Sequence, residues 1–548
     1  MAPDPLTGDF TANLVDLRAR RLFTARLAWT GGLISEVVEL GPEDPGLTYL
    51  IPGFVDAHVH VESAMLVPTE FARLASRHGT VACVSDPHEI ANVLGLDGVR
   101  YMLDNARRAA IRFHFGAPSC VPATPFETAG ARLGLAELET LFREDGLGYL
   151  SEMMNFPGVL AGDGEVMARI GLARARGLPV DGHAPGLRGA DARRYVQAGI
   201  STDHECTSLE EARDKLAAGM HILIREGSAA RDFDTLHPLI ASHPGQVMFC
   251  SDDKHPDDLL AGHIDRLAAR AVAAGHDPLA VLGCACLNPV RHYRLPLGLL
   301  GVGESMDAVE VADLRDFRPL RTWVGGRLVA AAGRSLCPAV AVAPANRFQA
   351  RPIAPGDLAV PASAASIRVI EARDGSLFTR ETFVSPRTAA EHLLADPGRD
   401  ILYLLVLNRY QAVPPAVAFV RGFGLARGAL ASSVAHDSHN VVAVGVDAAS
   451  LCQAVNAVVA RRGGIAVADG ERLELLPLPV AGLMSDQPGE RVAARYAELT
   501  ALARNLGSPL ASPFMTLSFM ALLVIPELKL SDRGLFDGRT FRFTELAS

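Results

Sequence analysis

The chain has 548 residues and a formal net charge of −10; 49% of its residues are hydrophobic, 21% are charged and only two are tryptophan. This composition excludes a disordered or fibrous chain, and the negative charge argues against a protein that holds a nucleic-acid backbone with clustered lysines and arginines. The chain is too long for a single hydrophobic core, so we expect a globular enzyme of several domains.

Both ends of the chain bear on where the protein works. The start, MAPDPLTGDF, has neither the basic nor the apolar region of a secretory signal. The longest late apolar run is interrupted by Pro526 and Lys529 and is too short to span a membrane. We therefore expect a cytoplasmic protein that contacts no membrane. The eight cysteines are scattered without metal or redox spacing, so we expect them to be reduced, buried and not metal ligands.

The pattern of apolar residues divides the chain into four parts. Residues 1–50 hold short β-like runs, such as ANLVDLRARRLF, ARLAWT and ISEVVEL, and residues 300–345 are also rich in strands, so the two could form one composite β domain. Between them, residues 51–299 alternate short apolar runs with helical stretches. This alternation predicts an α/β fold, either a (β/α)₈ TIM-type barrel or an open doubly wound sheet.

The last part of the chain has its own alternation of strands and helices. Residues 346–360 are rich in proline and alanine and are interpreted as a linker. Residues 361–548 contain strand-like runs such as DILYLLVLNRY and helical runs such as LCQAVNAVVARR, which predict a separate C-terminal α/β domain. We find no internal repeat.

A histidine pair opens the predicted barrel. In GFVDAHVHVE, His58 and His60 are two residues apart in a run of strand character, so both imidazoles project from the same face. One strand would thus offer two nitrogen ligands to one cation. Since the chain has 17 histidines, this spacing alone does not decide between a metal site and coincidence.

Three further residues follow apolar runs at the predicted carboxyl ends of strands, where a barrel carries its active site. They are His183 in LPVDGHAPG, His204 in GISTDHE and Asp252 in VMFCSDDKHPDD. Each alone could be a loop histidine or a helix-capping aspartate, but together with the first pair they predict a metal site. Histidine and carboxylate ligands without a thiolate suit Zn²⁺, Mn²⁺ or Fe²⁺.

Two cations would need a bridging group. In many metal hydrolases of this layout the bridge is a carbamylated lysine, but the first lysine of this chain is Lys215, which lies beyond His204. Glu152, in LGYLSEMMNFPG, follows an apolar run between the histidine pair and His183. It could be an ordinary loop glutamate, yet the missing lysine favours Glu152 as the bridge.

Two more polar clusters stand out. Asp86, His88 and Glu89, in VACVSDPHEIANVLG, follow another predicted strand; Asp86 could cap the next helix and still face the pocket. The second cluster, in VAHDSHNVVAVG, lies near a strand start in the C-terminal domain, and for it we favour a structural or interface role. Its polar residues are His436, Asp437 and His439.

Taken together, these motifs resemble the adenine deaminases of the amidohydrolase superfamily. The resemblance rests on HVH, DPHEIANVLG, EMMNFPG, DGHAPG, STDHE, LIREGSAAR and SDDKHPDD, and it extends to GALASSVAHDSHN and PFMTLSFMALLVIPELKLSDRGL near the end. It implies a (β/α)₈ barrel, a composite β domain and a C-terminal domain of the adenine deaminase type. It also implies a homo-oligomer and a binuclear centre of Mn²⁺, with Fe²⁺ or Zn²⁺ as alternatives. The resemblance assigns metal binding to His58, His60, Glu152, His183, His204 and Asp252. It places Asp86, His88 and Glu89 at the substrate pocket.

The expected reaction replaces the 6-amino group of adenine by oxygen and yields hypoxanthine and ammonia. Water bound to two cations has its pKa lowered towards 7 and can attack C6 as a bridging hydroxide. We expect Asp252 to move the proton of this water to the leaving ammonia. Glu89, or otherwise Glu152, would protonate N1 if neighbouring carboxylates raise its pKa.

Two other functions remain open at this stage. One is hydrolysis of a cyclic amide, as in dihydroorotases and hydantoinases, although such enzymes commonly use the lysine bridge. The other is a metal-free homologue that serves as a scaffold, although none of the six ligand positions is missing.

Overall fold

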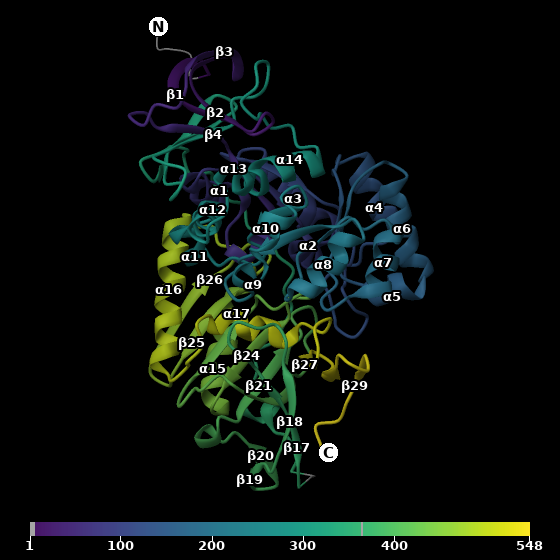
Figure 1. Ribbon diagram of the computed structural model, residues 1–548. Helices are drawn as coiled ribbons and strands as arrows, with labels where there is room; N and C mark the ends of the chain where they lie inside the picture. Colours follow the sequence, from purple (N-terminus) through teal and green to yellow (C-terminus); the bar gives the residue numbers. More distant parts are fainter. Residues whose placement is uncertain (1–5, 363–364, 548) are drawn as a thin grey trace.

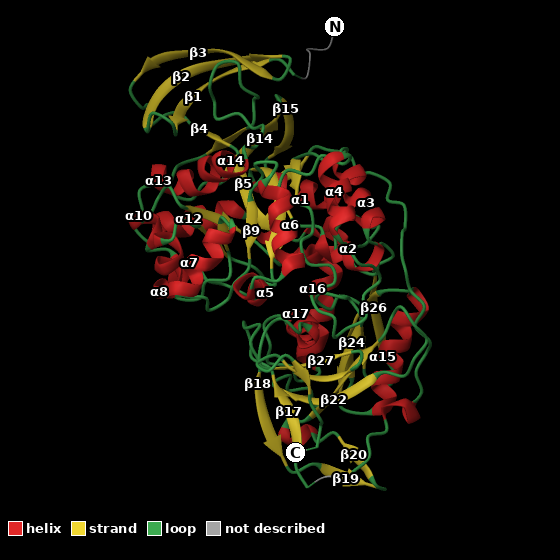
Figure 2. Cartoon of the chain, turned by 90° about the vertical axis from the view of Figure 1, so that its right-hand side faces the viewer, coloured by secondary structure: helices red, strands yellow, loops and turns green. Residues whose placement is uncertain are grey.

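The computed structural model describes residues 6–362 and 365–547. It shows a mixed α/β fold with a β-sheet at each end and a helix-rich body between them (Figures 1 and 2). No helix in these two ranges is both long and apolar enough to cross a membrane. All eight cysteines have free thiols, and all except Cys337 are buried.

The sheet at the N-terminal end combines strands from two distant segments. β4 pairs in parallel with β1 and antiparallel with β13, which joins the segments edge to edge. Leu14, Trp29 and Trp323 share one hydrophobic core. In spatial order the strands are β16 (Arg334–Ser335), β15 (Arg327–Ala331), β14 (Pro319–Val324), β13 (Ala308–Val311), β4 (Tyr49–Pro52), β1 (Gly8–Asp16), β2 (Arg21–Thr30) and β3 (Leu33–Gly41).

One strand expectation in this sheet was wrong. Residues 12–23, expected as one β-like run, contain the turn between β1 and β2. The Asp16 carboxylate accepts hydrogen bonds from the backbone amides of Arg18 and Ala19, and Arg20 has a φ of 51°. A short aspartate that satisfies the next backbone amides favours a turn over a continuous strand.

The middle of the molecule holds eight parallel strands in three sheets, each strand followed by helical structure. The sheets are β5 (Phe54–Val59), β6 (Thr80–Ser85) and β7 (Arg112–Phe115); β8 (Leu150–Met153) and β9 (Val180–Gly182); and β10 (Thr202–Asp203), β11 (His221–Arg225) and β12 (Val247–Cys250).

Backbone hydrogen bonds connect these sheets at their edges. The amide of Ala117 donates to the carbonyl of Tyr149 at 2.9 Å, and that of Ser201 donates to Val180 at 2.9 Å. A parallel bridge between Val59 and Asp252 connects the last strand to the first. Backbone contacts therefore connect each of the three sheets to the next one along the chain, and the third sheet to the first.

Helices surround these strands, as Figure 2 shows. They are α1 (Pro68–Ala75), α2 (His88–Leu94), α3 (Leu96–Ala106), α4 (Leu135–Arg143), α5 (Phe156–Ala161), α6 (Gly164–Arg174), α7 (Gly189–Ala198), α8 (Leu209–Ala217), α9 (Phe233–Leu236), α10 (Leu239–Ser242), α11 (Pro256–Ala261), α12 (Ile264–Ala273), α13 (Pro278–Leu282) and α14 (Asn288–Tyr293). Short 3₁₀ helices follow β5 and α1 at Val61–Ala64 and Ser76–His78, and a π-helical turn covers Gly283–Leu287.

The C-terminal region is built on a second eight-stranded sheet. Its order is β18 (Arg380–Val384), β17 (Ile367–Glu371), β22 (Ala416–Arg421), β21 (Leu402–Leu407), β24 (Val441–Gly445), β23 (Ala429–Ser432), β25 (Gly464–Ala468) and β26 (Leu473–Pro477). Smaller pieces are the hairpin β19 (Arg387–Ala389) and β20 (His392–Leu394), and the sheet of β27 (Leu528–Ser531), β28 (Gly534–Asp537) and β29 (Arg542–Phe543).

Both faces of this sheet are covered, because alternate residues of a strand point to opposite sides. Leu405 packs in one core with Val455 of α15 (Ala448–Arg461), whereas Leu404 lies in the core that continues into the middle of the molecule. α16 (Gly489–Asn505) and α17 (Pro513–Ser518) contribute to that second core. The C-terminal sheet is therefore packed against the middle of the molecule.

The segment 346–360, expected to be a linker, is mostly irregular but packed. Phe348 and Ile353 are buried in the α15 core, and the amide of Gln349 donates to the carbonyl of Arg409 at 2.7 Å. A 3₁₀ helix covers Pro355–Leu358.

Candidate metal centre and pocket

The carboxyl ends of the middle strands bring the expected ligands together in a buried cluster. His58 lies in β5 and His60 directly follows it; His183 and His204 directly follow β9 and β10. These side chains are at most 9% exposed. Parallel strands end on the same side of a sheet, which is why residues so distant in sequence meet here.

Three ligand atoms form a triangle at the first strand. The Nε2 atoms of His58 and His60 are 3.2 Å apart, and they lie 3.5 and 3.2 Å from Oδ1 of Asp252. Donors about 2.1 Å from one tetrahedral ion would be about 3.4 Å from each other. The donor types and their spacing therefore fit a divalent cation.

Neighbouring groups orient these ligands. Nδ1 of His60 lies 3.2 Å from the carbonyl oxygen of Asp86, which can only accept, so Nδ1 carries the proton and Nε2 is left for a cation. Oδ2 of Asp252 accepts from the guanidinium of Arg225 at 3.1 Å, which leaves Oδ1 facing the histidines. Asp252 has a φ of 53°, so its backbone conformation differs from that of a regular strand or helix.

Glu152 lies between this triangle and a second histidine pair. Its Oε1 is 3.3 Å from Nε2 of His60, while its Oε2 is 2.8 Å from Nδ1 of His183 and 3.1 Å from Nε2 of His204. One carboxylate thus contacts both groups of histidines. Lys215 is elsewhere: its ammonium binds the carboxylates of Asp203 and Glu211 at 2.7 Å each, as a buried ion triplet.

The surrounding imidazoles favour the ionised form of both central carboxylates. Burial by itself raises the pKa of Glu152, but the charge of His183 and the hydrogen bonds from the surrounding imidazoles hold that pKa well below its usual range. For Asp252 burial is likewise outweighed, here by hydrogen bonds from His58 and His60. Buried groups that can hold a metal ion include His58 with His204 and Asp252, and Glu152 with His183 and His204.

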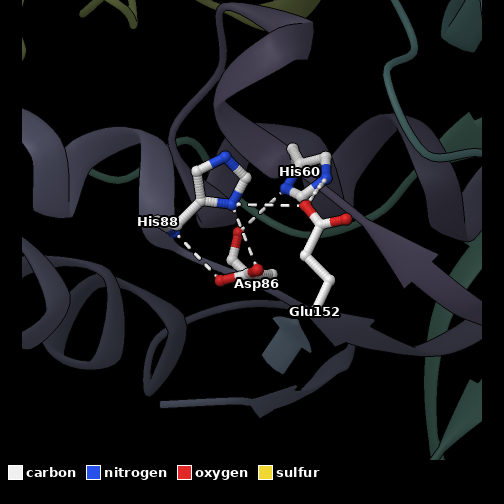
Figure 3. A group of neighbouring side chains, drawn as sticks. All are labelled: His60, Asp86, His88 and Glu152. Carbon is white, nitrogen blue, oxygen red and sulfur yellow. Dashed lines mark hydrogen bonds and ion pairs between the residues drawn. The ribbon is translucent and has the colours of Figure 1, made fainter. Parts of the chain in front are cut away.

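Asp86 and His88 adjoin this cluster (Figure 3). Nδ1 of His88 is 3.1 Å from Oδ2 of Asp86 and 3.6 Å from Oε1 of Glu152. Oδ1 of Asp86 also accepts from the backbone amide of His88 at the start of α2. Asp86 therefore supports the helix start and orients a pocket histidine at once.

Glu89 faces imidazoles from the C-terminal region. Its Oε1 is 2.5 Å from Nδ1 of His436, and its Oε2 contacts Nε2 of His439. Burial raises the pKa of Glu89, but the charges of these two histidines outweigh it and lower that pKa well below its usual range. In turn, although burial opposes it, the charge of Glu89 raises the pKa of His436 to about 9.

The surroundings expected for this glutamate were wrong. We expected neighbouring carboxylates to raise the pKa of Glu89, but its closest charged contacts are His436 and His439. The sequence favoured a structural or interface role for this cluster; in the structure His436 and Asp437 line the pocket. Oδ1 of Asp437 is 3.6 Å from Nε2 of His88. A single sequence carried no signal that the 436–439 loop folds onto α2.

Other pocket residues were missed as well. Glu205 and Asp253, each next to a predicted ligand, line the pocket, and Arg225 at the end of β11 contacts both Glu205 and Asp252. The position of Arg225 at the carboxyl end of a strand was the available signal. The C-terminal region adds an apolar side made of Leu377, Phe519 and Leu522. His58 and Asp86 do not line the pocket themselves; they contact His60 and His88, which do.

Comparisons with known proteins agree with this organisation. The model of the amidohydrolase family matches residues 49–329, and that of the adenine deaminase C-terminal domain matches residues 376–542. The adenine deaminase of Salinibacter ruber is 55% identical over 545 residues, which cover 99% of each chain. Those of Sulfurovum sp. and Methanosarcina mazei are 51% and 49% identical and cover 98% and 97% of this chain, and 99% and 98% of theirs.

Solved structures are more distant. A D-hydantoinase from Thermus sp. aligns with 60% of this chain and 96% of its own at 14% identity, with a TM-score of 0.46 that supports no conclusion about function. The sequence relatives, in contrast, extend over both ends of the molecule. The chain belongs to the adenine deaminase family of amidohydrolases.

Proposed function

We propose that this protein hydrolyses adenine to hypoxanthine and ammonia. The observation that carries the proposal is the identity of about half of all residues, over nearly the full length, to curated adenine deaminases. The buried cluster of imidazoles and carboxylates adds the chemistry that a hydrolytic deamination needs. The match of residues 376–542 to the adenine deaminase C-terminal domain argues against a cyclic amide hydrolase.

We propose that the eight middle strands form a closed (β/α)₈ barrel. Parallel pairing, the hydrogen bonds between neighbouring sheets and the Val59–Asp252 bridge support closure. The ligand cluster lies at the carboxyl ends of these strands, which is the active-site end of such barrels. An open doubly wound sheet would leave β5 and β12 apart.

We propose further that the cluster holds two divalent cations, with Mn²⁺ as the first candidate and Fe²⁺ or Zn²⁺ as alternatives. His58, His60 and Asp252 would hold one ion, His183 and His204 the other, and Glu152 would contact both. Such ions would lower the pKa of water towards 7 and so supply a nucleophile at neutral pH.

The side chains of the pocket would then move the protons. Oδ1 of Asp252 faces the cluster and would take the proton that the attacking water loses and pass it to the leaving ammonia. N1 of the ring needs a proton as well, and Glu89 is held against a protonated His436. We assign the proton for N1 to this pair, with His88, which Asp86 holds in place, orienting the substrate beside it.

The test offers Mn²⁺-loaded protein adenine, dihydrouracil and hydantoin in parallel, with a chelated sample as control. We expect hypoxanthine and ammonia from adenine alone, and none after chelation. Turnover of a cyclic amide without turnover of adenine would favour the alternative hydrolase, and no turnover of any substrate would favour the scaffold. The cytoplasmic location and the homo-oligomeric state stay predictions.

A further inference from the structure

The apolar side of the pocket comes from two separate segments of the C-terminal region. Leu377 lies before β18, and Phe519 lies in the 3₁₀ helix Phe519–Ala521 that follows α17. With Leu522 they form what we call the roof of the pocket. Nothing in the chain connectivity fixes Leu377 and Phe519 relative to each other, because 141 residues separate them.

A buried lysine contacts both segments. Lys529, in β27, is 0% exposed, and its Nζ donates to the carbonyl oxygens of Leu377 at 2.7 Å and Phe519 at 2.9 Å. Among residues 6–362 and 365–547 no carboxylate forms an ion pair with it. Burial accordingly lowers the pKa of Lys529 to about 7.

A charged or polar group at this position is costly for folding. Removing an amine from water is unfavourable, and an apolar side chain of similar size would avoid that cost. The two hydrogen bonds that the lysine donates offset part of this cost, and both acceptors are backbone carbonyls of roof residues. This makes a role in shaping the roof a better explanation than a role in the stability of β27.

The roof is connected to the proposed proton source. The ring of Phe519 stacks on that of His436 with centroids 5.1 Å apart and an angle of 30° between planes. His436 in turn contacts Glu89. A shift of the Phe519 backbone would therefore change both the roof and the placement of this histidine.

We propose that Lys529 is a positioning residue that ties the Leu377 and Phe519 segments together and so sets the height of the apolar roof over a flat aromatic ring. This inference rests on the proposed deamination of adenine. Lys529 does not line the pocket; it would act through the two backbone carbonyls that it binds.

The test compares Lys529→Met, which keeps the length of the side chain but donates no hydrogen bond, with the control Thr379→Val. Thr379 donates to the carbonyl of Leu528 at 2.8 Å, so the control loosens the same contact with β27 without freeing either roof carbonyl. The readouts are kcat and KM for adenine, bound Mn²⁺ and the melting temperature, all on the full chain.

We expect Lys529→Met to raise KM about tenfold or more, since a displaced wall weakens contacts with the whole ring, and to lower kcat by a smaller factor, since Phe519 also contacts His436. Metal content should equal that of the wild type, and Thr379→Val should keep the wild-type KM. If Lys529→Met does not fold, Lys529→Gln, with a shorter donor, is measured in the same way and should also raise KM.

Three outcomes would overturn the inference. A variant of Lys529 with wild-type KM, or a rise in KM that Thr379→Val matches, would reduce Lys529 to a structural residue. A wild-type protein that does not deaminate adenine at all would overturn the proposed function, and this inference with it. Wild-type turnover in the same assay separates these cases.

Discussion

The two sides of the pocket are built in different ways. On the side of the middle strands, proposed ligands such as His58, His183 and His204 are in strands or directly after them, so the backbone ladder fixes their positions. On the C-terminal side, His436 and Phe519 lie on loops or short helices that are held by side-chain contacts. We infer that the first side provides the ligands for the cations, whereas the second side provides the contacts with the adenine ring and the proton for N1.

The largest effect should come from the residue that joins the two ligand groups. Glu152→Gln keeps the shape of the side chain but removes the charge that two cations would share. We expect activity to fall by about 10³-fold or more, with loss of at least one bound ion, because the metal supplies the nucleophile. Steady-state kinetics and metal analysis would check this. Glu139→Gln, on the surface helix α4, should behave like the wild type.

The second-largest effect should come from Glu89, which contacts the C-terminal side of the pocket. Glu89→Gln breaks the pairing with His436 and His439 but touches none of the six proposed ligands. We expect kcat to fall by about 10²- to 10⁴-fold, the usual contribution of a positioned acid, with two ions still bound. An unchanged kcat with intact metal content would remove Glu89 from the mechanism.

The dependence of kcat/KM on pH tests the pair of Glu89 and His436 without changing Glu89. The pKa of His436 is raised to about 9, so the imidazolium is present below that pH and is lost as the pH rises through it. If this proton reaches N1, kcat/KM of the wild type should fall above about pH 9. In His436→Gln that alkaline decline should disappear and the plateau should be lower. A decline that persists unchanged in the variant would assign it to another group.

How much of this could be predicted from the sequence differs between the two sides. The buried cluster at the middle strands could be predicted because strand ends leave a pattern: an apolar run followed by a histidine or carboxylate. The strand-rich character of residues 1–50 and 300–345 was also visible, although the turn at Asp16 was missed.

The C-terminal side could not be found in this way. His436 contacts Glu89, which lies 347 positions away in the sequence, and Lys529 contacts Phe519 and Leu377, which lie 10 and 152 positions away. No local periodicity of the sequence indicates such pairings. Lys529 even appeared only as an interruption of an apolar run. The acid role of Glu89 was assigned for a wrong electrostatic reason, because its partners come from the other side of the pocket.

The smallest effect on activity should come from the face of the C-terminal sheet that is turned away from the pocket. Leu405→Ala removes a buried side chain that packs with α15, and we expect a loss of about 2–5 kcal/mol in the free energy of unfolding. KM and metal content should stay near wild type. Denaturant unfolding and kinetics would check both. A large change in KM for Leu405→Ala would mean that the two faces of the C-terminal sheet are not independent.

We propose that the cluster around Glu152 would hold two divalent cations, which would supply the nucleophile for the deamination of adenine. The most direct measurement is to strip the protein of metal, add back Mn²⁺ in steps, and record bound metal and hypoxanthine formation on the same samples. We expect no activity without metal and full activity at about two ions per chain. Undiminished hypoxanthine formation in metal-free protein, or full activity at one ion per chain, would contradict it.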